Sequence, residues 1–238
     1  MKKIFLIAFS VLLLCSCKKT TTEELLPVPK TTVKGVVALF DSTGARVPNA
    51  TGVTVSIDST TFTTTTDSDG NYTINNVAQG EYTITCSKTG YSTYKATNQF
   101  VLVEYSTTNI PPVYLYAPSI VTITNLTVQN SDSSCTISYT INPPSNFISE
   151  YVTFFISTSS TVSPSNYIMP ISFVSSYGST ITTQVSSLYQ YFPSGSTVYI
   201  VAYGSYSGIH YTSPSTGKIV YAGGLCAKPS NIASVTLP

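Results

Sequence analysis

Residues that could perform catalysis are few and scattered in this 238-residue chain. Its single histidine, His210, lies in an expected hairpin, whereas a Ser-His-Asp triad needs a carboxylate that orients the imidazole. The carboxylates of the same half of the chain have no reason to meet it. Zinc requires three or four converging His, Cys or carboxylate ligands, and no such spacing occurs. We therefore predict no catalytic residue, no metal and no cofactor.

The acidic residues of the first half allow two further readings. Asp67, Asp69 and Asn71 alternate as in the start of a calcium loop, but Tyr72 follows and no glutamate stands at the required distance. A turn is the better interpretation. A glycosidase needs two facing carboxylates. The carboxylates that meet this requirement by number alone are Asp58, Asp67, Asp69, Glu81 and Glu104, for which solubility is the simpler explanation.

The chain has five cysteines, for which we expect different roles. Cys15 and Cys17 lie at the N-terminus, while Cys86 shares the parity of the core-facing residues of its strand and is expected to be a buried, inert thiol. Cys135 and Cys226 remain. An exported protein folds where disulfides are permitted, so a bridge between these two is possible.

Tyrosines offer the only candidate ligand contacts. They fall in or near the loops of the second half of the chain, where exposed rings can stack on sugars or anchor a protein partner. Half of the aromatic residues there should be core residues by parity. The candidates are Tyr189, Tyr191, Tyr206 and Tyr211.

The N-terminus has the order of a targeting segment. A positive patch at residues 1–3 precedes the apolar run Ile4 to Leu14, which is well short of the ~20 residues that span a bilayer. Residues 1–16 are therefore expected to be a signal peptide. The polar, Thr- and Pro-rich residues 17–31 read as a spacer.

Leu14-Cys15-Ser16-Cys17 resembles the lipobox of bacterial lipoproteins. The resemblance implies that Cys17 becomes the acylated first residue and holds the protein on a membrane. A plain cleaved signal, or an uncleaved anchor with incidental cysteines, is the alternative. Lys18 in place of aspartate favours the outer membrane, on its periplasmic face or at the cell surface, and the charged residues that follow resemble those of Bacteroidota surface lipoproteins.

Composition bounds the fold class. Charged residues make up 9% of the chain, against ~25% in typical domains, and the net charge is +1, so no nucleic-acid partner is expected. Ser, Thr, Tyr, Val and Ile are abundant, and Gly and Pro recur at short intervals. This composition favours strands and predicts an all-β protein with almost no helix, long enough for two domains.

Residues 32–117 form the expected first module, a meander of short antiparallel strands. Alternating apolar residues at 33–39 and 53–57 predict half-buried strands, and turns at 67–70 and 78–80 separate two more. The series resembles the carboxypeptidase regulatory-like domain, which implies a transthyretin-like β-sandwich without catalytic activity. The segments that carry the resemblance are Gly35-Val36-Val37, Val47-Pro48-Asn49-Ala50, "TDSDGNY" at 66–72, "NVAQGEYTI" at 76–84 and "KTGY" at 88–91.

Residues 118–222 form the expected second module, with strand-like runs at regular spacing that predict another sandwich. The stretch "LYQYFPSGSTVYIVAY" at 188–203 resembles the fibronectin type III domain, an Ig-like sandwich, and implies that Tyr199 forms a tyrosine corner. The expected core tryptophan is missing, and Tyr139 takes its place in this interpretation. Residues 223–238 read as an extended tail or the start of a third domain.

Function follows only in outline. We expect a lipid-anchored, non-enzymatic envelope protein that acts as a binding or spacer module for a glycan or a surface protein. A structural subunit of a fimbria-like surface assembly is the alternative, since edge strands can accept a neighbour's strand. An enzyme with an unfamiliar site is a third.

Overall fold

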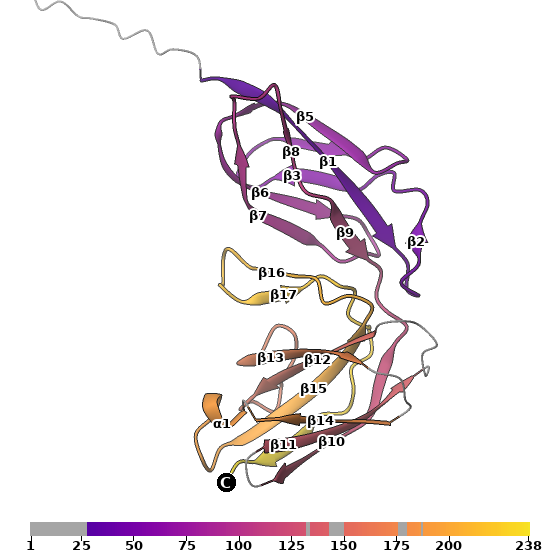
Figure 1. Ribbon diagram of the computed structural model, residues 1–238, viewed down its shortest axis with the longest axis vertical. Coiled ribbons are helices and arrows are strands. Elements are labelled where there is room, and N and C mark those ends of the chain that lie inside the picture. The colour runs from indigo at the N-terminus through magenta and orange to yellow at the C-terminus, as the bar shows by residue number, and fades with distance from the viewer. Residues whose placement is uncertain (1–27, 132–133, 143–149, 176–179, 187) are drawn as a thin grey trace, which may run out of the picture.

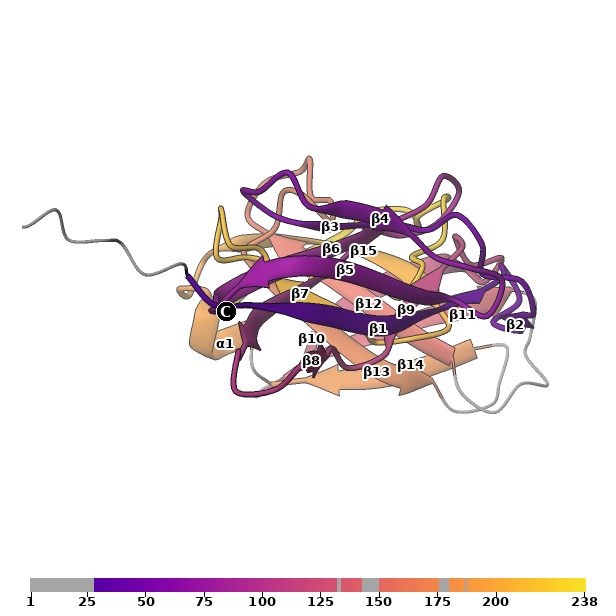
Figure 2. The same ribbon diagram turned by 90° about the horizontal axis from the view of Figure 1, so that it is seen from above.

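The computed structural model describes residues 28–131, 134–142, 150–175, 180–186 and 188–238. Two β-sandwich modules stack along the long axis, as Figure 1 shows from the side and Figure 2 from above. Within the described residues the one helix is α1, Leu188–Tyr191, which confirms the predicted all-β class. No helix in these residues has the length and hydrophobicity to cross a membrane.

The first module consists of two sheets that face each other. β1 is the longest strand and runs the length of the module, pairing on one side with β5 and on the other with β8 and β9 in parallel. One sheet contains β2 (Arg46–Val47), β1 (Lys30–Phe40), β5 (Asn71–Ala78), β8 (Thr107–Asn109) and β9 (Val113–Tyr116). The other contains β4 (Thr63–Thr65), β3 (Thr54–Ile57), β6 (Gly80–Ser87) and β7 (Tyr94–Val101).

Strand alternation builds the core of this module as predicted. Val33, Val37 and Leu39 of β1 are buried and meet the inward residues of β3 and β6. Cys86 is fully buried among them, and burial raises the pKa of its thiol to about 12, so it is the inert thiol that parity predicted. The turn before β5 is closed by Asp67, whose Oδ1 accepts the N–H of Asp69 at 3.0 Å.

The second module also has two sheets. The smaller sheet contains β10 (Thr122–Ser131), β11 (Ser134–Asn142) and β14 (Thr180–Val185). The larger contains β13 (Met169–Ser175), β12 (Glu150–Ser157), β15 (Thr197–Ser205) and β18 (Ala233–Thr236). A hairpin of β16 (His210–Thr212) and β17 (Ile219–Tyr221) leaves this body and reaches the first module.

The core of the second module contains Tyr139, which is 2% exposed and meets Phe154 edge-on at 5.3 Å between ring centroids. It therefore fills the core position that the sequence assigned to it. Tyr199 faces the opposite side of β15, against a separate cluster that includes Phe155, whereas the hydroxyls of Tyr167 and Tyr189 donate to backbone carbonyls. The tyrosine corner expected at Tyr199 is thus wrong.

The expected C-terminal tail belongs to the second module. β18 pairs antiparallel with β15, and Leu237, which is 2% exposed, enters the core between the sheets. Its backbone N–H donates to the carbonyl of Ser196 at 2.9 Å. Residues 223–238 are therefore an integral edge of the sandwich, because a buried leucine and a strand ladder fix them there.

Hydrogen bonds join the two modules directly. The Ser92 hydroxyl donates to the carbonyl of Ala222 at 2.6 Å and accepts the N–H of Tyr116 at 3.2 Å. The N–H of Ile120 donates to the carbonyl of Ser42 at 3.1 Å. Because these groups come from loops of both modules, the bonds restrict the angle between the two bodies.

Candidate functional site: the inter-module cleft

A cavity of about 260 Å³ lies where the β16–β17 hairpin meets the first module. Edge strand β7 provides one wall, and the Pro111–Pro112 segment before β9 provides the other. We call it the inter-module cleft. It is lined by Tyr94, Lys95, Ala96, Thr97, Gln99, Pro111, Pro112, Val113, His210 and Tyr211.

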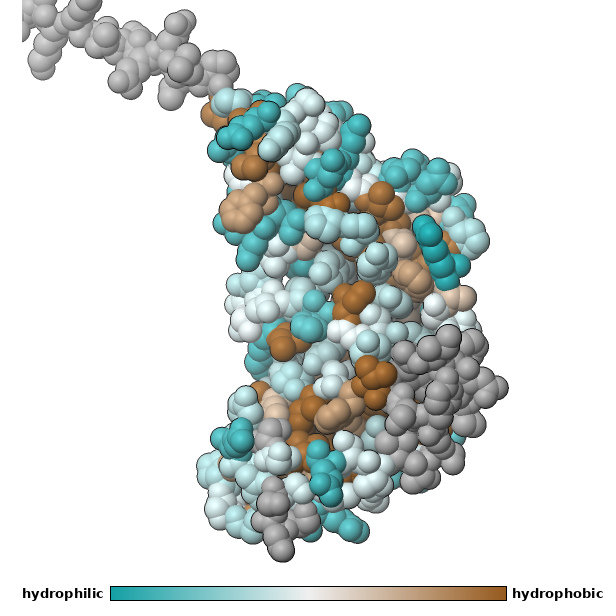
Figure 3. All heavy atoms as spheres, in the orientation of Figure 1, coloured by the Kyte–Doolittle hydropathy of each residue, from teal (hydrophilic) through white to brown (hydrophobic). Residues whose placement is uncertain are grey.

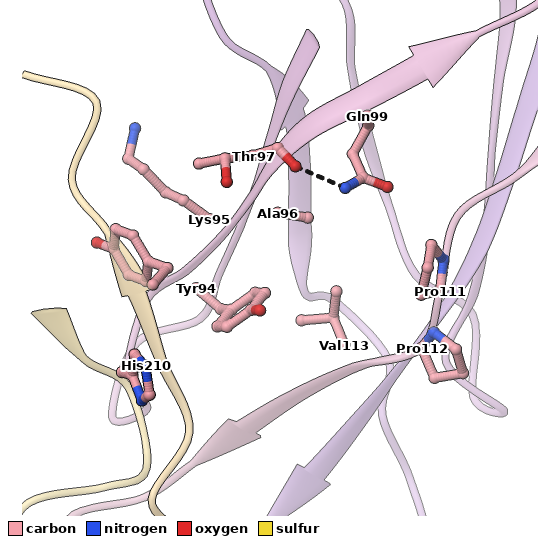
Figure 4. A pocket seen from close by; sticks show the side chains of 10 residues that line it. Tyr94, Lys95, Ala96, Thr97, Gln99, Pro111, Pro112, Val113 and His210 are labelled. Carbon is pink, nitrogen blue, oxygen red and sulfur yellow. Dashed lines mark hydrogen bonds between the residues drawn. The ribbon is translucent and has the colours of Figure 1, made fainter. Parts of the chain in front are cut away.

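Two tyrosines from different modules form the aromatic part of the cleft. Tyr94 of β7 and Tyr211 of β16 meet edge-on, with ring centroids 5.8 Å apart and an interplanar angle of 76°. This arrangement suits the aromatic quadrupole, and both side chains line the cavity. Figure 4 shows Tyr94 in the middle of the cleft, with Val113 and Pro112 beyond it.

An ion pair lies beside the aromatic pair. Lys95 Nζ lies 2.6 Å from Asp58 Oδ2, and the Thr85 hydroxyl donates to Asp58 Oδ1 at 2.6 Å. Burial raises the pKa of the Tyr211 hydroxyl, which Lys95 partly opposes and Asp58 reinforces. Tyr211 is thus a neutral phenol, close enough to the pair to sense its charges.

Polar groups with hydrogen-bonding capacity line opposite sides of the cleft (Figure 4). The Gln99 amide donates from Nε2 to the Thr97 carbonyl at 2.7 Å, which fixes the amide plane and leaves Oε1 as an acceptor. His210 Nδ1 lies 2.9 Å from the carbonyl of Gly208. A carbonyl only accepts, so Nδ1 carries the proton and Nε2 is an acceptor in the neutral ring.

The four tyrosines expected as ligand contacts do not come together. Tyr211 alone lines the cleft. Tyr206 packs against the backbone of Gly44 in the first module, and Tyr189 donates its hydroxyl to the carbonyl of Ser134 at 3.2 Å. Tyr191, 62% exposed, lies on α1 at the far end of the second module. The structure therefore divides these candidates among three separate places.

Sequence reasoning missed most of the cleft, including Tyr94 and Gln99. Both lie on β7, a strand that the apolar pattern did not predict. Tyr94, Ala96 and Val101 all pack on the module core, but residue 101 has the opposite parity to residues 94 and 96, so no single alternation marks the strand. His210, expected in a solvated hairpin, is exposed at the start of β16, as predicted.

The disulfide expected between Cys135 and Cys226 is wrong, because both residues are free, buried thiols. Cys135 lies near the beginning of β15. Its strand partner Asn130 donates its side-chain amide to the carbonyl of Thr236, and Thr236 pairs with Thr197, the first residue of β15. Cys226 donates its N–H to Gly204, near the other end of β15. Seven residues of strand span about 23 Å, whereas a disulfide needs Cα atoms within about 7 Å.

The groups that line the cleft are mostly aromatic, apolar or neutral and polar. Among its lining residues there is no carboxylate, and the described part of the chain holds no cluster of three His, Cys, Asp or Glu side chains that could bind a metal. The cleft presents aromatic rings, a fixed amide and an imidazole acceptor. Cys17 lies outside the described residues.

Comparison with known proteins identifies the type of the first module. Residues 32–112 match the carboxypeptidase regulatory-like domain, which bears out the resemblance seen in the sequence. The matched residues form most of the sandwich built from β1 to β9. A search of curated proteins finds no match.

Solved structures give weaker likenesses. A cohesin–X-dockerin complex of Acetivibrio cellulolyticus matches at 28% identity, 37% coverage of this chain and a TM-score of 0.31, and the chain spans 58% of that structure's length. A DUF3823 family protein from Bacteroides uniformis matches at 17% identity and a TM-score of 0.35, with 88% of this chain and 100% of that chain covered. A candidate carbohydrate-binding protein from the same organism matches at 12% identity, with 88% of this chain and 100% of that chain covered and a TM-score of 0.35. Such scores carry no information on ligands.

Proposed function

We propose that this protein is a non-enzymatic binding and spacer module of the cell envelope that holds a short, neutral glycan in the inter-module cleft. The observation that carries the proposal is the meeting of Tyr94 and Tyr211 above a rim of polar groups, at a cavity without carboxylates. Its volume of about 260 Å³ lies near the lower end of ligand sites and suits one or two sugar rings.

The cleft favours a neutral ligand over a charged one. Its one ammonium group, on Lys95, is already paired with Asp58, so an anion would compete with an existing ion pair. The free acceptors, Oε1 of Gln99 and Nε2 of His210, call for donors such as sugar hydroxyls. Tyr94 and Tyr211 provide apolar faces for the C–H side of a ring.

Anchoring is part of the same proposal. Acylation of Cys17 would hold the protein on the outer membrane, at its surface or periplasmic face, because several acyl chains together bind a bilayer stably. The support is the order of the N-terminal residues and the lysine after the cysteine. Metabolic labelling with an alkynyl fatty acid should mark the native protein and fail to mark a Cys17→Ala variant.

The glycan site is tested by binding neutral oligosaccharides to the protein, first on an array and then by calorimetry. Tyr211→Ala and Gln99→Ala should each weaken binding about tenfold, the equivalent of 1.4 kcal/mol. Tyr191→Ala removes an exposed tyrosine at the far end and serves as the matched control. Equal affinities of all three variants would place the ligand elsewhere.

The alternative of a structural subunit needs a strand edge that is free to pair. Edge strand β13 exposes Val174 by 58%, which favours such pairing, but Pro170 lies within the same strand and provides no N–H. Pro170 therefore counts against pairing along this edge. Mass measurement at high concentration separates the two, since a subunit of an assembly should form oligomers.

A further inference from the structure

Large apolar side chains are exposed together at the end of the first module where β1 begins. Phe100 and Tyr105 are each 61% exposed, and Leu102 is 41% exposed. Val28, directly before β1, is also 61% exposed. We call these four residues the apolar tip. Figure 3 shows apolar surface at this end of the molecule.

The apolar tip is held by the fold rather than by a loose loop. The Thr31 hydroxyl donates to the carbonyl of Tyr105 at 2.8 Å, which fastens the β7–β8 connection to the start of β1. Phe100 pairs with Glu81 across the β6–β7 ladder and points outward, because its neighbour Val101 is fully buried. These side chains are therefore presented together on a fixed surface.

The position of the chain's N-terminal segment identifies what covers this surface. Residues 17–27 join the apolar tip directly and can span at most about 40 Å. If Cys17 is acylated, as the proposed function holds, the bilayer lies within that distance of the tip. Helix α1 and the C-terminus lie at the opposite end of the molecule (Figure 1). A lipid surface is thus the partner that the tether brings to these residues.

Charge around the tip defines the kind of contact. Lys30, Glu81 and Glu104 are exposed nearby and have mixed signs, so anionic lipid is not specifically attracted. Apolar side chains with a tyrosine among them suit the boundary between headgroups and acyl chains. The contact should therefore form on zwitterionic lipid and resist salt.

We propose that the apolar tip lies in the interfacial layer of the membrane that carries the lipid anchor, so that the protein stands upright on the bilayer. β1 runs the length of the first module, and its eleven residues span about 36 Å. Val113, which lines the inter-module cleft, pairs with Val37 in the second half of this strand, away from the end that carries the tip. The first module thus holds the cleft away from the lipid.

The test uses the full acylated protein in phosphatidylcholine vesicles. Leu102→Cys receives a fluorophore, and Tyr191→Cys, 62% exposed at the opposite end, is the matched control. Cys86, Cys135 and Cys226 are buried and do not compete for the label. Lipids with a quencher near the headgroup should quench the label at 102 at least threefold and leave the label at 191 unchanged, at low and high salt.

Contrary results are distinguishable. Equal quenching at both positions overturns the inference, as does protection of the 102 label from lipid and aqueous quenchers alike, which would indicate a protein partner. Phe100→Ser with Tyr105→Ser, in the Leu102→Cys background, should lose at least half of the quenching, and unchanged quenching overturns the apolar contact. The mass of the N-terminal peptide reports separately whether Cys17 is acylated. A protein without the lipid anchor is thereby distinguished from an anchored protein whose apolar tip does not contact the membrane.

Discussion

Replacing Gly70 by alanine should open the first module. Gly70 adopts φ +86° in the turn before β5, a conformation that costs other residues about 1–2 kcal/mol. An added Cβ would lie 2.0 Å from the carbonyl oxygen of Val37, which belongs to the backbone of β1. β1 would have to move away, and the bond from the Val37 N–H to the Gly70 carbonyl, 2.9 Å long, would be lost.

The sum of these effects is about 3 kcal/mol or more, because a lost hydrogen bond and displaced strand add to the backbone strain. Gly90→Ala provides the matched control. Gly90 has nearly the same φ, +84°, but no atom lies within 4 Å of its added Cβ. Its cost should therefore be the strain alone, about 1 kcal/mol.

Thiol labelling followed by mass spectrometry can measure each module separately. Cys86 is buried in the first module and Cys135 in the second, so each reacts only when its own module opens. When reclosing is fast, the reaction rate follows the open population. Gly70→Ala should accelerate labelling of Cys86 at least a hundredfold and Gly90→Ala about fivefold, with Cys135 unchanged. Equal acceleration by both substitutions would refute the steric reasoning.

Three further predictions concern an ion pair, the module joint and the C-terminus. Burial raises the pKa of Asp58, but the bond and charge of Lys95 contribute to a net lowering. The stabilising effect of the pair is therefore present above pH ~4 and lost as the pH falls through the lower folded pKa. Asp58→Asn should lower the free energy of unfolding, measured by urea melts, by less than about 1 kcal/mol at pH 7 and have little effect at pH 2. Ser92→Ala leaves the buried Ala222 carbonyl without its donor and should cost about 1–2 kcal/mol, with faster hydrogen exchange at the joint but not in the cores. Leu237→Ala should destabilise the second module by about 2–4 kcal/mol in denaturant melts, whereas a loose tail would give no change.

The first module was largely predictable because its strands alternate strictly. Val53, Val55 and Ile57 are buried as the pattern required, and the Asp67 turn forms where the sequence placed it. β7 was missed for a physical reason. Asn98 adopts φ +55° within it, and the register with β6 shifts there. A bulge changes the side-chain parity, so a search for period-two alternation loses the strand.

The second module shows where local patterns stop being sufficient. Pro170 obscured β13, although a proline is tolerated on an edge strand. β18 has only four residues, and no alternation that short can be told from a tail. Its pairing depends on Leu237, whose burial is a property of the assembled sandwich. Contacts between segments distant in the chain decide such cases.

The cleft was beyond prediction for a related reason, and that reason bears on its use. Tyr94 and Tyr211 are distant in the sequence and meet only because the two modules are joined. A ligand that touches both rings binds the joined arrangement and not the separated modules, so it must stabilise the joint by RT ln(1 + [L]/Kd). Saturation at a hundred times Kd amounts to about 2.7 kcal/mol, comparable with the expected loss from Ser92→Ala. A saccharide that binds in the cleft should therefore restore slow hydrogen exchange at the joint of that variant, whereas a ligand bound elsewhere should not.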